Sequence, residues 1–135
     1  KRNVQVGIRL NPNTDPKTLK QISTGKKENK FGVNEKTFFE LVNYCKNSND
    51  LELKCLSVHI GSQILDHKPY EKMLKVINKI IKKTNYQFEF IDLGGGMGIS
   101  YNDDNKKLNY KKYSLAIKKF FIINYIFFSF NYNFS

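Results

Sequence analysis

Apolar and polar residues alternate along the first ten positions of the chain, as they do in a β-strand with one buried face. The apolar positions of this face are Val4, Val6, Ile8 and Leu10. A second strand is expected over 53–60 and a third over 88–93. In the second strand one face carries Leu56, Val58 and Ile60, and the other carries Cys55, Ser57 and His59.

The segments between the strands repeat apolar residues every three or four positions, which predicts amphipathic helices. Asn34 is placed to cap a helix over 34–47. A second helix is expected to begin near Pro69, with Asp66 close to the capping position. Its buried stripe would consist of Tyr70, Met73, Leu74, Ile77 and Ile81. A third helix is expected over 110–121.

The predicted order of strand and helix, repeated three times, is typical of α/β proteins whose parallel strands are joined by right-handed crossovers. Two architectures share this order: an open doubly wound sheet and a (β/α)8 barrel. A barrel needs about 250 residues. The 135 residues of this chain would therefore supply only part of one. The alternation of elements alone does not choose between the two.

The last residues differ in composition from the rest. The segment 120–135 contains six of the eleven phenylalanines and no charged residue. We expect residues 1–119 to form one part of a domain, and 120–135 to be an atypical Phe-rich tail that is not native family sequence, such as an interrupted or out-of-frame coding end. The alternative is a genuine buried strand. The tail is too short and too rich in Asn and Ser to be a membrane anchor.

The formal net charge of +11 raises the question of a nucleic-acid partner. Of the 23 basic residues only Arg2 and Arg9 are arginine, although arginine is favoured for reading bases and gripping phosphates. The lysines accompany an excess of Asn, Ile, Phe and Tyr, which favours coding bias and solvated helix faces. The alternative is a small basic protein that binds nucleic acid or phosphate without catalysis.

Two cysteines, Cys45 and Cys55, are too few for a disulfide scaffold or a zinc site. No run reaches the roughly 20 apolar residues that span a bilayer. The chain begins Lys1-Arg2 without a secretory leader. We therefore expect a cytoplasmic piece of a longer protein.

Glycine-containing runs follow two of the predicted strands. His59-Ile60-Gly61-Ser62-Gln63 ends the second strand, where the glycine allows close backbone approach and Ser62 offers a hydroxyl. Asp92-Leu93-Gly94-Gly95-Gly96-Met97-Gly98 ends the third, and consecutive glycines expose N–H groups that can form an anion nest. Taken alone, the histidine could be structural and the glycine-rich turn a flexible bend. The long loop with Ile22-Ser23-Thr24-Gly25 and Lys30-Phe31-Gly32 is either functional or a solvated polar loop.

Together with Arg9-Leu10-Asn11-Pro12 and Ile99, these runs resemble the diaminopimelate decarboxylases, which belong to the barrel-type, pyridoxal-phosphate-dependent group that also holds ornithine and arginine decarboxylases. The resemblance extends over about 4–120, and the order and spacing of the five motifs are specific to the group. The Ser-Thr-Gly loop, the complete His-Ile-Gly-Ser-Gln run and the Gly-Ile-x-Tyr ending at Tyr101 indicate the diaminopimelate branch. The resemblance implies the central β/α units of a partial (β/α)8 TIM barrel.

The resemblance also implies pyridoxal 5'-phosphate as cofactor and gives roles to individual residues. His59 would pack against the face of the cofactor ring. The phosphate would be held by Ser62 and by Gly94, Gly95 and Gly96. Arg9 faces the same interior and is expected to support the site. Lys30 resembles a loop lysine of the family and not the lysine that is linked to the cofactor.

Several family features are expected to lie outside this chain. The Schiff-base lysine belongs to an earlier barrel strand. The Glu-Pro-Gly-Arg segment, which should follow the last helix, is not found in 120–135. The substrate-binding cysteine and tyrosine belong to a further domain, so neither Cys45 nor Cys55 takes that role, and Leu19 stands where many relatives have histidine. We therefore expect no catalytic residue, no metal site and no activity in this fragment by itself.

The implied function of the intact protein is that of a lyase of lysine biosynthesis. It would remove the carboxylate at the D-configured carbon of meso-2,6-diaminopimelate and release L-lysine and CO2. The expected partners are a small amino-acid substrate and a second copy of the intact enzyme, with no nucleic acid and no membrane. The alternative within the group is a decarboxylase of another basic amino acid or polyamine precursor.

Overall fold

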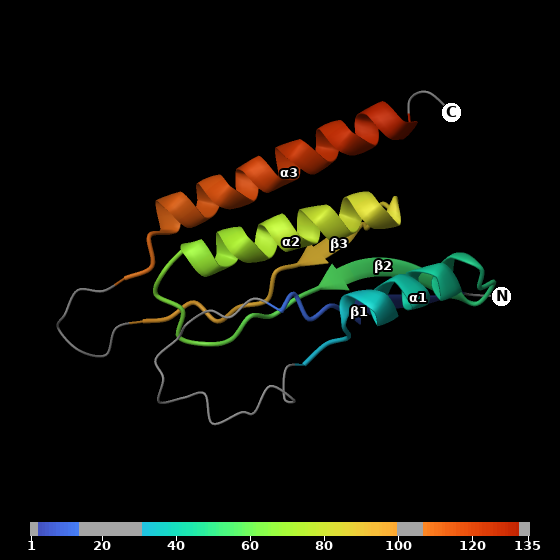
Figure 1. Ribbon diagram of the computed structural model, residues 1–135, viewed down its shortest axis with the longest axis horizontal. Coiled ribbons are helices and arrows are strands. Elements are labelled where there is room, and N and C mark those ends of the chain that lie inside the picture. Colours follow the sequence, from blue (N-terminus) through green and yellow to red (C-terminus); the bar gives the residue numbers. More distant parts are fainter. Residues whose placement is uncertain (1–2, 14–30, 100–106, 133–135) are drawn as a thin grey trace.

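The chain forms a parallel α/β layer in the computed structural model, which describes residues 3–13, 31–99 and 107–132 (Figure 1). The elements follow in the order β1 (Val4–Arg9), α1 (Glu35–Lys46), β2 (Leu51–Ser57), α2 (Lys68–Thr84), β3 (Phe90–Asp92) and α3 (Tyr110–Tyr132). The three strands are parallel and lie in the order β1-β2-β3. The predicted α/β class and the alternation of strands and helices are confirmed.

The core lies where the helices pack against one another and against the sheet. Helix α1 begins as expected, because the Asn34 side chain accepts a hydrogen bond from the Thr37 amide at 3.0 Å. Helix α2 buries the whole predicted stripe and adds Ile80 to it. It runs beside α3 in Figure 1. The main buried apolar residues are Ile8, Leu10, Phe38, Val42, Leu56, Val58, Tyr70, Met73, Ile77 and Ile81.

The sheet contains one irregularity, at Lys54 in β2. Val6 pairs with Leu53 but Gly7 pairs with Cys55, so that β2 holds one extra residue at this point. Such a bulge interrupts the alternation of the strand. Leu53 is therefore buried like Leu56, although the two lie three positions apart and would point to opposite faces of a regular strand. Beyond the bulge the predicted faces are observed, since Leu56, Val58 and Ile60 are buried while Cys55, Ser57 and His59 are half-buried.

The strands are shorter than the sequence pattern predicts. We expected the second over 53–60, but β2 begins at Leu51 and ends at Ser57. Four residues further on, Gly61 takes a positive φ of 130° and turns the chain. The third was expected over 88–93, whereas β3 spans only Phe90–Asp92. The alternation of apolar residues continues past the last ladder pair, so it overestimates strand length.

The third helix is longer than expected. We expected it over 110–121, but α3 continues to Tyr132. The alternative of a buried strand for the tail is therefore wrong for 120–132. The physical reason is that the tail contains neither glycine nor proline, so nothing in its sequence breaks a helix that has already begun.

Candidate functional site

The last residues of the three strands lie side by side in the sheet. In the register of the sheet, Arg9 pairs with Ser57 and Ser57 pairs with Asp92, and these are the last residues of β1, β2 and β3. Parallel strands place the polar residues at their carboxyl ends along the same edge. The two glycine-containing runs leave the sheet at this edge. A single edge therefore brings together the runs that the sequence singled out.

Asp92 is the centre of the polar contacts at this edge. Its Oδ2 accepts a hydrogen bond from the Ser57 hydroxyl at 2.8 Å, and its Oδ1 accepts one from the Gly94 amide at 2.8 Å. These two hydrogen bonds, the Gly94 amide first, lower the pKa of Asp92 below its ordinary value, and the charges of His59 and Arg9 act in the same direction. Asp92 is therefore held as a carboxylate.

His59 lies directly against the glycine-rich turn. A Cβ added at Gly94 would lie 2.7 Å from His59 Nδ1 and 2.6 Å from the Val58 carbonyl oxygen. Gly94 also has a φ of 69°, which L side chains rarely adopt. Only glycine therefore fits between the Asp92 carboxylate and the histidine ring.

The turn itself alternates in backbone conformation. Gly94 and Gly96 have positive φ values of 69° and 85°, and Gly95 between them does not. Such alternation points successive N–H groups toward one side and forms a concave anion-binding nest. A Cβ added at Gly95 would have nothing within 4 Å, so the middle of the turn opens to free space. The amide of Gly94 is engaged by Asp92, which leaves the later part of the turn to face a ligand.

Backbone hydrogen bonds tie the two glycine-containing runs together. The Ile64 amide donates to the Gly96 carbonyl at 2.9 Å, and the Gly98 amide donates to the Ile64 carbonyl at 3.0 Å. A Cβ at Gly96 would overlap the Gly61 carbonyl oxygen. Ser62, next to Gly61, is exposed. The hydroxyl of Ser62 and the open side of Gly95 therefore belong to loops that are fixed relative to each other.

Tyr70 of α2 holds the turn by a hydrogen bond to its backbone. It is fully buried on α2, and its hydroxyl donates a hydrogen bond to the Gly95 carbonyl at 3.2 Å. Burial raises the pKa of Tyr70 to about 12, even further above neutral pH than the ordinary value of tyrosine. Tyr113 of α3 packs edge-on against the same ring, with centroids 4.9 Å apart. Both helices therefore position the open part of the turn.

Arg9 and part of the loop that follows β1 complete the edge. The Arg9 guanidinium lies 5.4 Å from the centre of the Phe31 ring, a cation–π contact. The loop returns to the sheet through a bridge between Leu10 and Val33. Of the third predicted motif, Phe31 and Gly32 lie here, whereas Ile22-Ser23-Thr24-Gly25 and Lys30 lie outside the described residues.

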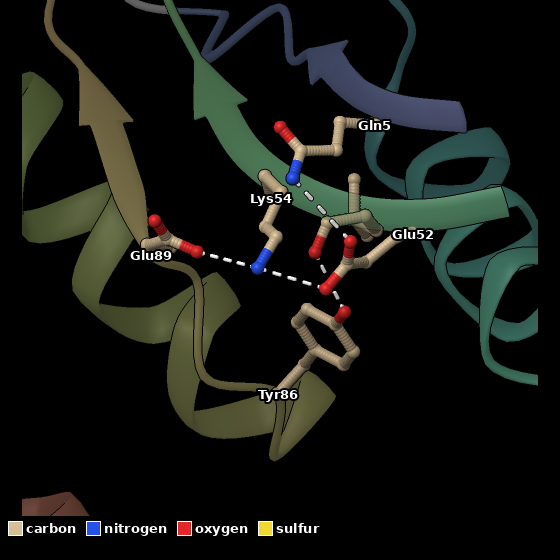
Figure 2. Close-up of polar contacts among 6 residues, drawn as sticks. Gln5, Glu52, Lys54, Tyr86 and Glu89 are labelled. Atoms are coloured by element: carbon tan, nitrogen blue, oxygen red, sulfur yellow. Dashed lines mark hydrogen bonds and ion pairs between the residues drawn. The ribbon is translucent and has the colours of Figure 1, made fainter. Parts of the chain in front are cut away.

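A second polar cluster lies at the opposite end of the strands (Figure 2). Lys54, the extra residue of β2, forms ion pairs with Glu52 at 2.8 Å and with Glu89 at 2.6 Å. The hydrogen bonds to these two carboxylates raise the pKa of Lys54 above its ordinary value. The charges of the cluster are paired with one another, and no predicted site residue belongs to it.

The structure thus brings His59, Gly94, Gly95, Gly96 and Ser62 to one edge, as the sequence suggested. Sequence reasoning missed the roles of Asp92 and Tyr70. Asp92 stood at the start of the glycine-rich run, but its contacts depend on the register between β2 and β3. Tyr70 was expected only in the core, and no sequence signal shows that its hydroxyl reaches the turn.

No group of three or more His, Cys, Asp or Glu side chains in the described part of the chain is arranged to hold a metal ion. No helix among these residues is both long and apolar enough to cross a membrane. Cys45 and Cys55 are both free thiols.

Comparison with known proteins gives the family. Residues 1–124 match the family described as pyridoxal-dependent decarboxylase, pyridoxal binding domain. The chain belongs to this family. Among curated pyridoxal-dependent decarboxylases, the diaminopimelate decarboxylase of Helicobacter pylori is 44% identical over 108 residues, which are 77% of this chain and 27% of that protein. The diaminopimelate decarboxylase of Campylobacter jejuni is 37% identical over 116 residues, or 84% of this chain and 29% of that protein.

Solved structures of this family agree with the observed fold. Diaminopimelate decarboxylase from Helicobacter pylori, complexed with L-lysine, has a TM-score of 0.75 and 38% identity over 87% of this chain and 30% of that one. The enzyme from M. jannaschii, in co-complex with L-lysine, has a TM-score of 0.68 and 30% identity over 89% of this chain and 29% of that one. This chain therefore spans less than a third of the length of these relatives.

Proposed function

We propose that this chain is the part of a pyridoxal-phosphate-dependent diaminopimelate decarboxylase that holds the cofactor phosphate and one face of the cofactor ring. The observation that carries the proposal is the turn Gly94–Gly96, which is open at Gly95 and packed against His59 at Gly94. The curated relatives at 44% and 37% identity are diaminopimelate decarboxylases, which supports this branch over other basic-amino-acid decarboxylases.

The residues present fit pyridoxal phosphate. A phosphate dianion needs several donors on one side, and the alternating turn together with the exposed Ser62 hydroxyl offers them. A flat ring needs a flat partner beside the phosphate, and the His59 imidazole lies against the same turn. The Asp92 carboxylate is engaged by Ser57 and Gly94 and so does not oppose an anion as a free charge would.

In this proposal the residues have distinct tasks. Gly95, Gly96 and Ser62 bind the phosphate, and Gly94 contributes its left-handed conformation and the room that it leaves for His59. His59 orients the ring by packing against its face. Pyridoxal phosphate, when bound, supplies an electron sink at the carbon that loses its carboxylate. The substrate is expected to be meso-2,6-diaminopimelate and the product L-lysine.

The proposal also covers architecture and assembly. Three parallel strands with their site at the carboxyl edge agree with the central units of a (β/α)8 barrel, in which active sites lie at that edge. The intact enzyme is expected to be a cytoplasmic homodimer. Residues 1–119 would belong to the pyridoxal-binding domain and 120–135 to a tail of another origin. The family match runs to residue 124, which includes the first five residues of this tail.

The test uses a hybrid enzyme, in which residues 3–119 of this chain replace the matching segment of the Helicobacter pylori diaminopimelate decarboxylase. We expect the hybrid to bind pyridoxal phosphate and to decarboxylate meso-2,6-diaminopimelate. A folded hybrid that binds no pyridoxal phosphate would contradict the proposal. A hybrid that binds pyridoxal phosphate but does not decarboxylate meso-2,6-diaminopimelate would contradict the assignment of this chain to the diaminopimelate branch.

A further inference from the structure

We propose that Asp92 is a positioning residue that holds the glycine-rich turn and the His59 ring in fixed relation to each other. The inference rests on the proposed function, because it concerns how the same site is held in shape. Asp92 itself does not touch the cofactor in this proposal. It acts through Gly94, whose amide it binds, and through the row of strand ends to which it belongs.

The first step is the double attachment of the carboxylate. Oδ1 accepts from the Gly94 amide at 2.8 Å, and Oδ2 accepts from the Ser57 hydroxyl at 2.8 Å. One oxygen therefore binds the turn after β3, and the other binds the last residue of β2. Because both bonds come from one planar carboxylate, they hold the start of the turn against the end of β2, in addition to the backbone bonds from Val58 to Asp92 and from Ile64 to Gly96.

The second step links the turn to His59. Gly94 lies so close to His59 Nδ1 that an added Cβ would be 2.7 Å from it. A shift of Gly94 toward the ring would therefore displace the imidazole, and a shift away would leave a gap beside it. Since His59 lies two residues beyond Ser57 on the same segment, Asp92 fixes both sides of this contact.

The third step concerns the charge of Asp92. Arg9 and His59 both favour its ionised form, as do the two hydrogen bonds. Arg9 has the Phe31 ring on one side. Its buried Nε has no hydrogen-bond partner among the described residues. The arginine thus acts on Asp92 through its charge at the end of β1, and the three strand ends Arg9, Ser57 and Asp92 form one unit.

A role limited to stability explains these contacts less well. Asp92 is exposed, and hydrogen bonds and charges at exposed positions contribute little to the free energy of unfolding. All of the partners named above belong to the edge that carries the site. Glu89, only three residues earlier, provides a matched comparison, because its carboxylate is also exposed and paired, with Lys54 at 2.6 Å, but at the other end of the sheet.

The experiment compares three variants of the hybrid enzyme: Asp92→Ala, Asp92→Asn and Glu89→Gln. The first measurement is amide hydrogen exchange in the cofactor-free form. Asp92→Ala removes the acceptor of the Gly94 amide, and we expect the exchange of Gly94 to rise by about tenfold while core amides such as Leu56 stay unchanged. Asp92→Asn keeps an oxygen acceptor, so in this variant the exchange of the Gly94 amide should stay within about threefold of the parent. Glu89→Gln should not affect the turn.

The second measurement is the affinity for pyridoxal phosphate, followed by kcat and KM with meso-2,6-diaminopimelate. We expect Asp92→Ala to weaken cofactor binding by about tenfold and to lower kcat more than it changes KM, with a smaller effect for Asp92→Asn. The inference is overturned if Asp92→Ala leaves Gly94 exchange and cofactor affinity unchanged. It is also overturned if exchange rises equally in the core, because Asp92 would then be merely structural. If the parent hybrid binds no cofactor but Gly94 exchange responds as expected, the proposed function is wrong. The attachment of Gly94 to Asp92 is then supported only as a structural contact.

Discussion

Alanine at Gly96 should destabilise the turn, whereas alanine at Gly95 should leave it nearly unchanged. At Gly96 the backbone has a φ of 85°, and an added Cβ would overlap the Gly61 carbonyl oxygen. At Gly95 the φ is not positive, and an added Cβ would meet nothing within 4 Å. The two residues are adjacent glycines and receive the same substitution, so any difference between the variants reflects the local backbone geometry at each position.

The expected change in the free energy of unfolding follows from these two differences in geometry. A non-glycine residue in the left-handed region costs about 1–2 kcal/mol. Loss of the hydrogen bond from the Ile64 amide to the Gly96 carbonyl, as the turn moves away from Gly61, costs about 1 kcal/mol more. We therefore expect Gly96→Ala to lower the free energy of unfolding by about 2–3 kcal/mol. Gly95→Ala should change it by less than about 0.5 kcal/mol, as surface substitutions usually do.

The assay is urea unfolding of the cofactor-free hybrid enzyme, with the parent and both variants measured side by side. A third variant, Gly95→Asp, separates folding from binding. It should fold like Gly95→Ala but bind pyridoxal phosphate at least about tenfold more weakly, because a carboxylate in the turn repels the phosphate dianion. Equal destabilisation by alanine at Gly95 and Gly96 would refute the geometry, and parent-like affinity of Gly95→Asp would refute the phosphate site.

Other changes test the remaining contacts. Tyr70→Phe removes the hydrogen bond to the Gly95 carbonyl but keeps the buried ring, so unfolding free energy should fall by about 1 kcal/mol in urea titrations; a loss as large as that of a cavity mutant would contradict this. His59→Ala should leave pyridoxal phosphate bound through its phosphate while kcat falls, which cofactor titration beside steady-state kinetics would show; unchanged turnover argues against ring packing. The lowered pKa of Asp92 means that its stabilising effect is complete above the ordinary value of 3.8 and is lost as pH falls below it. Ser57→Ala should raise that pKa in a carbon-13 NMR titration, and no change would show that the hydroxyl does not act on the carboxylate. The 135-residue chain alone should show no decarboxylase activity. It should also aggregate in size-exclusion chromatography, because apolar side chains are exposed both on the sheet, at Val4 and Phe90, and on α3, at Phe121 and Ile122; a monodisperse, active chain would overturn this.

The order of elements could be predicted because it depends on local pattern. The capping role of Asn34 and the buried stripe of α2 follow from side chains a few residues apart, and both are observed. The position of the glycine-rich turn could be predicted because consecutive glycines at the end of a strand allow the backbone to turn in conformations that other residues rarely adopt.

What could not be predicted depends on contacts between distant parts of the chain. The bulge at Lys54 is visible only from the pairing of β1 with β2, and the bonds of Asp92 only from the pairing of β2 with β3. Tyr70 looked like an ordinary core residue, since its hydroxyl meets the Gly95 carbonyl only once α2 is packed. The length of α3 was underestimated because the change in composition at Phe120 is not a helix-ending signal.

The proposed function depends on the binding of the phosphate of pyridoxal phosphate by the turn Gly94–Gly96. The most direct measurement is the change in backbone amide NMR signals of the hybrid enzyme on titration with pyridoxal phosphate, compared with pyridoxal, which lacks the phosphate. We expect the amide signals of Gly95 and Gly96 to shift with pyridoxal phosphate and to stay in place with pyridoxal at the same concentration. Unmoved glycine amides in a hybrid enzyme that binds the cofactor would contradict this.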